Sequence, residues 1–138
     1  QALRVPIDYH IMRLALRSGL VRVTDPQLAH LLRERTPVSG QVDQLVRSRV
    51  EEACDLLVEA SGRSVFQVDM ALWHIGRNCC FYEHEPYCGR CPRPDKCSLA
   101  ESLGYECGGR CPLDGACLGS RDPAYRAYWE TNIYTTYY

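Results

Sequence analysis

The cysteines of this chain are crowded into one short region, and this restricts the possible folds more than any other feature of the sequence. The chain has 138 residues and nine cysteines, and every cysteine except Cys54 lies within residues 79–117. A small secreted scaffold needs disulfides because it lacks a core, whereas residues 1–78 are patterned as helices and the N-terminus carries no apolar signal segment. Metal ligation therefore explains the crowding better than disulfide bonding does.

The spacing of apolar residues predicts a mostly α fold. We expect helices in four segments, at residues 7–18, 24–35, 42–60 and 64–79. Signals for helix ends support these segments. Thr24 or Asp25 is a candidate N-cap, Gly19 is a natural stop, and Ser64 with Gln67 forms a capping-box pattern.

Three parts follow one another along the chain. We expect a helical domain at residues 1–78, Cys-rich metal-cluster loops at 79–120 and an aromatic C-terminal tail at 121–138. Aromatic rings in such a tail can stack on bases. More often they pack over a metal-binding loop or against a partner subunit, and we favour packing here.

The charge and hydropathy of the chain exclude some classes of protein. A net charge of −1 argues against a protein held on nucleic acid by bulk positive charge, although a local basic face remains open. No run of eighteen apolar residues is present, so we expect no membrane span. We expect an intracellular location, in the cytoplasm or at the nucleoid.

The cysteine-rich region contains an internal repeat. CGRCPRPDKCSLA at 88–100 and CGGRCPLDGACLGS at 107–120 share the frame Cys-Gly-(x)-Arg-Cys-Pro, in which x is present only in the second segment. In both segments five residues separate the second cysteine from the third. Either a local duplication or two similar binding tasks explains this similarity.

One set of four cysteines has spacing suited to a metal centre. Two residues separate Cys88 from Cys91, and five separate Cys91 from Cys97. Seven residues separate Cys80 from Cys88. Four thiolates on a compact loop suit either a tetrahedral zinc ion or a four-iron cluster. Supply of all four ligands by a single loop favours the iron–sulfur cluster, because zinc ribbons commonly use two distant knuckles.

The segment WHIGRNCCFYEHEPYCGRCPRPDKC at 73–97 resembles the C-terminal cluster segment of endonuclease III-type DNA glycosylases, members of the helix-hairpin-helix superfamily. In that family a helix ending in Gly-Arg leads into Cys-x6-Cys-x2-Cys-x5-Cys. The last two spacings match, and the first loop is one residue longer here. The resemblance implies a 4Fe-4S cluster bound by four cysteines, with Cys79 as an alternative to the first ligand. The four implied ligands are Cys80, Cys88, Cys91 and Cys97.

A second match lies at the start of the chain. VPIDYHIMRLALRSGLV at 5–21 resembles the segment of the same family in which Val-Asp-Thr-His opens a helix, with His10 and Arg13 on the pattern. The resemblance implies that Asp8 is the catalytic aspartate. A carboxylate in the first helical turn stays ionised and can stabilise an oxocarbenium-like sugar while the base departs. The alternative is that Asp8 is only a helix cap.

The resemblance also has gaps that shape the expected function. The glycine-rich hairpin of the family is not in this sequence, so we expect it upstream or on a partner chain. Lys96 is the only lysine, which favours a hydrolase that removes a damaged base over a lyase. The substrate is expected to be DNA, with RNA or a nucleoside as alternatives. A non-catalytic, metal-stabilised module that binds nucleic acid or protein is the second hypothesis.

Basic residues near the third and fourth predicted ligands are candidates for DNA contacts. Arg90, Arg93 and Lys96 can supply positive charge, whereas Glu83 and Glu85 make the preceding loop a poor phosphate contact. Ordinary solvated charge is the alternative for the three basic residues.

The remaining clustered cysteines form a second set. Cys79, Cys107, Cys111 and Cys117 can hold another cluster or a zinc ion, and a local disulfide or free thiols are the alternatives. Cys54 falls on the apolar face of a predicted helix, so we expect it to be an inert core residue.

Overall fold

The computed structural model describes residues 3–81, 86, 88–91, 97, 101, 104 and 106–134. Its helices are α1 (Tyr9–Ser18), α2 (Pro26–Arg33), α3 (Gly40–Ser61), α4 (Val65–Asn78), α6 (Leu118–Arg121) and α7 (Pro123–Arg126). The predicted mostly α class is confirmed, and no strand occurs within the described ranges. None of the described helices combines the length and the apolar character needed to cross a membrane.

The ends of the helices follow the local signals in the sequence. Asp25 is the N-cap of α2, and Ser64 with Gln67 forms the predicted capping box at the start of α4. Helix α1 ends at Gly19, which has a left-handed φ of 79° that favours glycine. Helix α1 begins at Tyr9, two residues after the predicted start at residue 7, because Asp8 is the N-cap and has an extended backbone.

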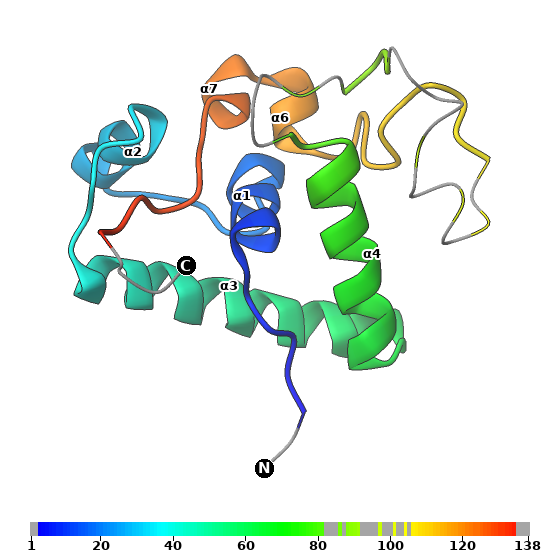
Figure 1. Ribbon diagram of the computed structural model, residues 1–138, viewed down its shortest axis with the longest axis horizontal. Helices are drawn as coiled ribbons and strands as arrows, with labels where there is room; N and C mark the ends of the chain where they lie inside the picture. The colour runs from blue at the N-terminus through cyan, green and yellow to red at the C-terminus, as the bar shows by residue number, and fades with distance from the viewer. Residues whose placement is uncertain are drawn as a thin grey trace.

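Helix α1 lies at the centre of the molecule, with α2, α3 and α4 around it and α6 and α7 across one end (Figure 1). Every residue of α1 from His10 to Arg17 is buried. Ile11, Met12 and Leu16 join the main core, which also includes Val50 and Cys54 of α3. A helix surrounded in this way can hold charged side chains only where the surrounding chain provides partners for them.

The chain after α7 passes back beside α1 toward α2 and α3 (Figure 1). Tyr128 is buried in the core, and the Thr131 hydroxyl is hydrogen-bonded to Asp43 and lies 3.2 Å from the sulfur of Met12. A single parallel bridge joins Pro37 to Asn132. Residues 128–132 therefore pack as part of the fold.

Helices α1 and α4 approach each other closely at Gly76. A β-carbon built on Gly76 would lie 2.7 Å from the backbone oxygen of His10, which is closer than real β-carbons come to other atoms. Replacement of this glycine must push the two helices apart.

We expect Gly76→Ala to lower the free energy of unfolding by about 1–3 kcal/mol, because the added methyl group overpacks a contact between two backbones. Gly40→Ala is the matched control, since a β-carbon at Gly40 meets no atom within 4 Å. Urea denaturation of both variants measures the difference. Equal midpoints for the two variants would contradict the close contact.

Candidate functional site

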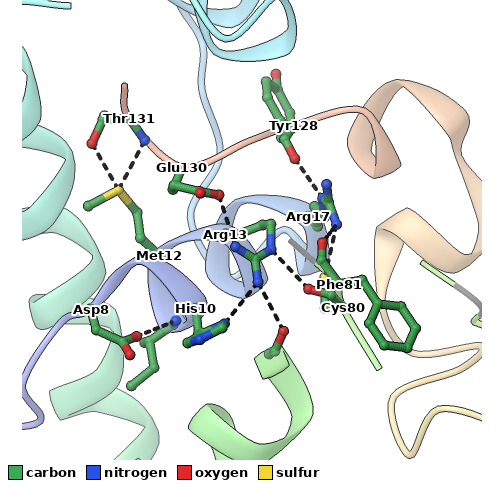
Figure 2. A network of polar contacts seen from close by, with 12 residues as sticks. Asp8, His10, Met12, Arg13, Arg17, Cys80, Phe81, Tyr128, Glu130 and Thr131 are labelled. Carbon is green, nitrogen blue, oxygen red and sulfur yellow. Dashed lines mark hydrogen bonds and ion pairs between the residues drawn. The ribbon is translucent and has the colours of Figure 1, made fainter. Parts of the chain in front are cut away.

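A fully buried arginine joins three parts of the chain at the centre of the candidate site. The Arg13 side chain is 0% exposed, and its Nε donates to the backbone oxygen of Cys80 at 2.9 Å. Its terminal nitrogens reach the backbone oxygen of Gly76 at 3.1 Å and the Glu130 carboxylate at 3.0 Å (Figure 2). Arg13 thus connects α1, the end of α4 and the chain after α7.

His10 completes this network on the side of Asp8. Its Nδ1 lies 3.0 Å from a terminal nitrogen of Arg13, and because a guanidinium only donates, this ring nitrogen must accept. Burial lowers the pKa of His10, and the nearby Arg13 charge lowers it further. The neutral imidazole is therefore the form that the fold favours.

Arg17 makes a second set of buried contacts one turn further along α1. Its Nε donates to the backbone oxygen of Tyr128 at 2.6 Å, and one terminal nitrogen donates to Phe81 O at 3.0 Å. The same nitrogen lies 3.6 Å from the sulfur of Cys80 (Figure 2). Burial raises the pKa of the Cys80 thiol, whereas Arg17 acts in the opposite direction by favouring the thiolate.

Asp8 caps the first turn of α1. Its Oδ1 accepts the backbone N–H of Ile11 at 2.9 Å, and the residue is half-buried. The structure thus contains the helix cap that the sequence suggested as the simpler role. A cap bond to one carboxylate oxygen is compatible with chemistry at the other oxygen.

A second carboxylate near Asp8 was missed by the sequence analysis. Burial raises the pKa of Asp69 in α4, and the charge of Asp8 adds to this effect. The spacing between Asp69 and Gly76 is seven residues, or two helical turns, so both occupy the face of α4 that meets α1. The seven-residue spacing could have placed Asp69 near α1, but only with the knowledge that Gly76 contacts α1.

The cysteines in the 79–117 region fall into two places. Five line one small cavity beside the end of α4, together with Asn78, Phe81 and Arg110; they are Cys79, Cys91, Cys97, Cys107 and Cys111. Cys80 faces Arg17, and the Cys117 thiol donates to the backbone oxygen of Arg17 at 3.6 Å. Of the four ligands implied by the resemblance, Cys91 and Cys97 thus lie together at the cavity, whereas Cys80 and Cys88 are not among its lining residues.

The thiols of the cysteine-rich region are suitable ligands for a metal ion, although the described ones are not close enough together to coordinate one. All nine cysteines are free thiols, so the disulfide alternative is not realised. Within the described part of the chain, no three His, Cys, Asp or Glu side chains are close enough to hold a metal ion. Burial, followed by the nearby cysteine thiolates, raises the pKa of Cys88 to about 11. Metal binding here must therefore displace protons from thiols.

The other predicted residues are placed as follows. Cys54 is fully buried in α3, and burial raises the pKa of its thiol to about 11, as suits an inert core cysteine. Arg90 is exposed. Arg93 and Lys96 lie outside the described residues, as do Glu83 and Glu85.

We expect Arg13→Met to destabilise the fold by about 3–5 kcal/mol, because it leaves the nearly buried Glu130 carboxylate without its charge partner. Arg49→Met removes an exposed ion pair to Glu52 and should cost at most about 1 kcal/mol. Chemical denaturation compares the variants. Arg13→Met/Glu130→Gln should recover part of the loss, and a loss no larger than that of Arg49→Met would contradict the role of Arg13.

Comparison of the chain with known proteins gives no match, whether to a protein family, to a characterised protein or to a solved structure. A function can therefore be inferred only from the geometry of the site and from the two sequence segments at residues 5–21 and 73–97. Those segments are joined in space by one helix, because α1 carries Asp8 at its beginning and contacts Cys80 through Arg13 and Arg17.

Proposed function

We propose that this protein is a DNA glycosylase of the endonuclease III type, or a part of one. It would remove a damaged or modified base by hydrolysis of the N-glycosidic bond. The observation that carries the proposal is the position of Asp8, which begins the helix that Arg13 joins to the cysteine-rich region. The two segments that resemble the family are thus coupled within one site.

Asp8 would act on the sugar. The Ile11 amide donates to one carboxylate oxygen of Asp8 at 2.9 Å and holds the carboxylate in place at the start of α1. As the base departs, positive charge develops on the sugar, and a carboxylate held in place stabilises it without reorganisation. A water molecule then adds to the sugar and completes hydrolysis.

His10 and Arg13 would hold this helix in register. Arg13 donates to backbone oxygens at the end of α4, so the start of α1 cannot shift without loss of buried hydrogen bonds. The neutral His10 ring accepts a hydrogen bond from Arg13. The negative charge that pairs with Arg13 is the Glu130 carboxylate. Both residues position Asp8 and do not need to touch the substrate.

A 4Fe-4S cluster would have a structural role. Cys80 and Cys88 are the predicted ligands that do not line the cavity, and we propose both as cluster ligands. Such a cluster would cross-link the segments that carry its ligands. Arg17, which lies 3.6 Å from the Cys80 sulfur, would offset part of the negative charge of the thiolates.

A second candidate function is a non-catalytic binding module. The cap bond from Asp8 to Ile11 favours it, because a helix cap explains this aspartate without any reaction. In such a protein the metal-binding loops would shape a surface for nucleic acid or a protein partner.

We expect Asp8→Asn to reduce base release by about 100-fold or more, because it removes the charge opposite the developing cation. Asparagine caps helices as well as aspartate does, so stability should change little. Asp25→Asn, the same exchange at the cap of α2, is the control and should leave activity intact. The assay uses DNA duplexes that each carry one oxidised, deaminated or alkylated base. Release of none of these bases by the wild-type protein would favour the binding module, and full activity of Asp8→Asn would exclude Asp8 as the catalytic group.

The exposed Arg90 is the described candidate for a phosphate contact. We expect Arg90→Ala to weaken binding to a short DNA duplex and to reduce the slope of log K against log salt by about 1. Arg49→Ala on α3 is the control, since Arg49 is also exposed but is paired with Glu52. An unchanged salt slope in Arg90→Ala would show that Arg90 is ordinary solvated charge.

A further inference from the structure

The neighbouring cysteines at the end of α4 lie in different surroundings. Cys79 lines the small cavity together with four other cysteines. Cys80 is 6% exposed, and its sulfur lies 3.6 Å from a terminal nitrogen of Arg17. Consecutive side chains diverge by about 100° at a helix end, so two neighbouring thiols cannot easily serve the same small centre.

The cavity brings the two sequence repeats together. Cys91 and Cys97 come from the first repeat, and Cys107 and Cys111 come from the second. Backbone hydrogen bonds hold the repeats side by side. The Cys91 amide donates to Gly109 O at 2.5 Å, and the Cys111 amide donates to the Cys88 oxygen at 2.8 Å. This order of partners is antiparallel, and it brings cysteines of both repeats to one cavity.

A second group of thiols lies at the end of α1, away from the cavity. Cys80 receives a contact from the Arg17 side chain, and the Cys117 thiol donates to the Arg17 backbone oxygen at 3.6 Å. Neither cysteine lines the cavity, and Cys88 does not line it either. Cys88, from the first repeat, lies close enough to Cys117 and Cys80 for their charges to act on its thiol, so this group also draws on both repeats.

Cys111 lies between the two groups. In the cavity its thiol is hydrogen-bonded to that of Cys79. Its amide donates to the backbone oxygen of Cys88, and its thiol is close enough to Cys88 for their charges to interact. A tetrahedral ion takes four thiolates, and the cavity offers five. Assignment of Cys111 to the group of Cys88 leaves four thiols in each place.

We propose that the eight clustered cysteines form two interleaved metal sites, each with thiolates from both repeats. The cavity site would bind a single zinc ion through Cys79, Cys91, Cys97 and Cys107. The site at the end of α1 would use Cys80, Cys88, Cys111 and Cys117. This arrangement differs from the sequential one suggested by spacing, in which the first repeat and the second repeat serve separate sites.

The chemistry of the cavity supports zinc. Four thiols would release four protons to form a tetrathiolate with a net charge of −2. Arg110 lines the same cavity and offers a positive charge. Its guanidinium also forms an ion pair with Asp114 at 2.7 Å. The small cavity suits one ion better than a cluster of eight atoms. The thiols would have to move inward to bind it, since the described side chains are not at bonding distance.

The test is a metal count on the full chain purified without oxygen. Zinc, iron and sulfide per chain are measured for wild type and for Cys→Ser variants at 88, 91, 107 and 117. We expect Cys91→Ser and Cys107→Ser each to lose the zinc and keep the iron, and the double variant to lose no more than either. Cys88→Ser and Cys117→Ser should lose iron and sulfide but keep the zinc. Cys54→Ser, in the core, is the control and should keep both.

Other results would overturn the proposal. Loss of the same metal in Cys88→Ser and Cys91→Ser, with a different metal lost in Cys107→Ser and Cys117→Ser, would establish the sequential arrangement. A wild-type chain with fewer than two metal centres would exclude paired sites. If serine variants fail to fold, Cys91→His and Cys107→His in cobalt-loaded protein replace them. Both histidines should shift the visible bands of one and the same cobalt ion, and shifts in different ions would contradict the shared cavity.

The zinc half of this inference does not depend on base excision. Loss of zinc in Cys91→Ser can be scored whether or not Asp8 is catalytic, because the metal count does not use a DNA substrate. Failure of the glycosylase assay would leave the zinc site standing, and failure of the zinc count would leave the role of Asp8 untouched.

Discussion

The buried guanidinium of Arg13 is the interaction on which the rest of the structure depends. Removal of an arginine from water is costly, and the cost is offset only when every direction of the guanidinium has a partner. Here Cys80 O, Gly76 O, His10 and Glu130 provide those partners from three separate parts of the chain. The path of α4 and of the chain after α7 is thereby tied to α1.

The two ends of α1 lie beside different groups, a carboxylate at the start and cysteines near the end. Asp8 lies at its start, half-buried and capping the helix, while Arg17 near its end contacts Cys80 and Cys117. A helix is stiff over ten residues, so a movement of Arg17 caused by the cysteine-rich region would be carried along α1 to Asp8. A metal ion bound by these cysteines would thus be coupled to the candidate carboxylate by packing, without direct contact.

The helices of the first 78 residues were predictable because their signals are local. The capping box at Ser64 and the stop at Gly19 depend on hydrogen bonds within one turn, and the observed caps follow them. The candidate carboxylate Asp8 was also visible in the sequence. Asp69 was not, because its effect on the site arises from contact between α1 and α4, and nothing near it in the sequence marks that contact.

The sequence by itself determined the helical class, the caps at Gly19, Asp25 and Ser64, and the supply of thiols in one short region. It could not determine which thiols meet, because spacing along a loop reports only distances within that loop. The antiparallel pairing of the two repeats, through the amides of Cys91 and Cys111, brought cysteines of both repeats to one cavity. The burial of Arg13 and Arg17 was likewise decided by tertiary structure, since an arginine becomes a core residue only where distant segments bring acceptors to it.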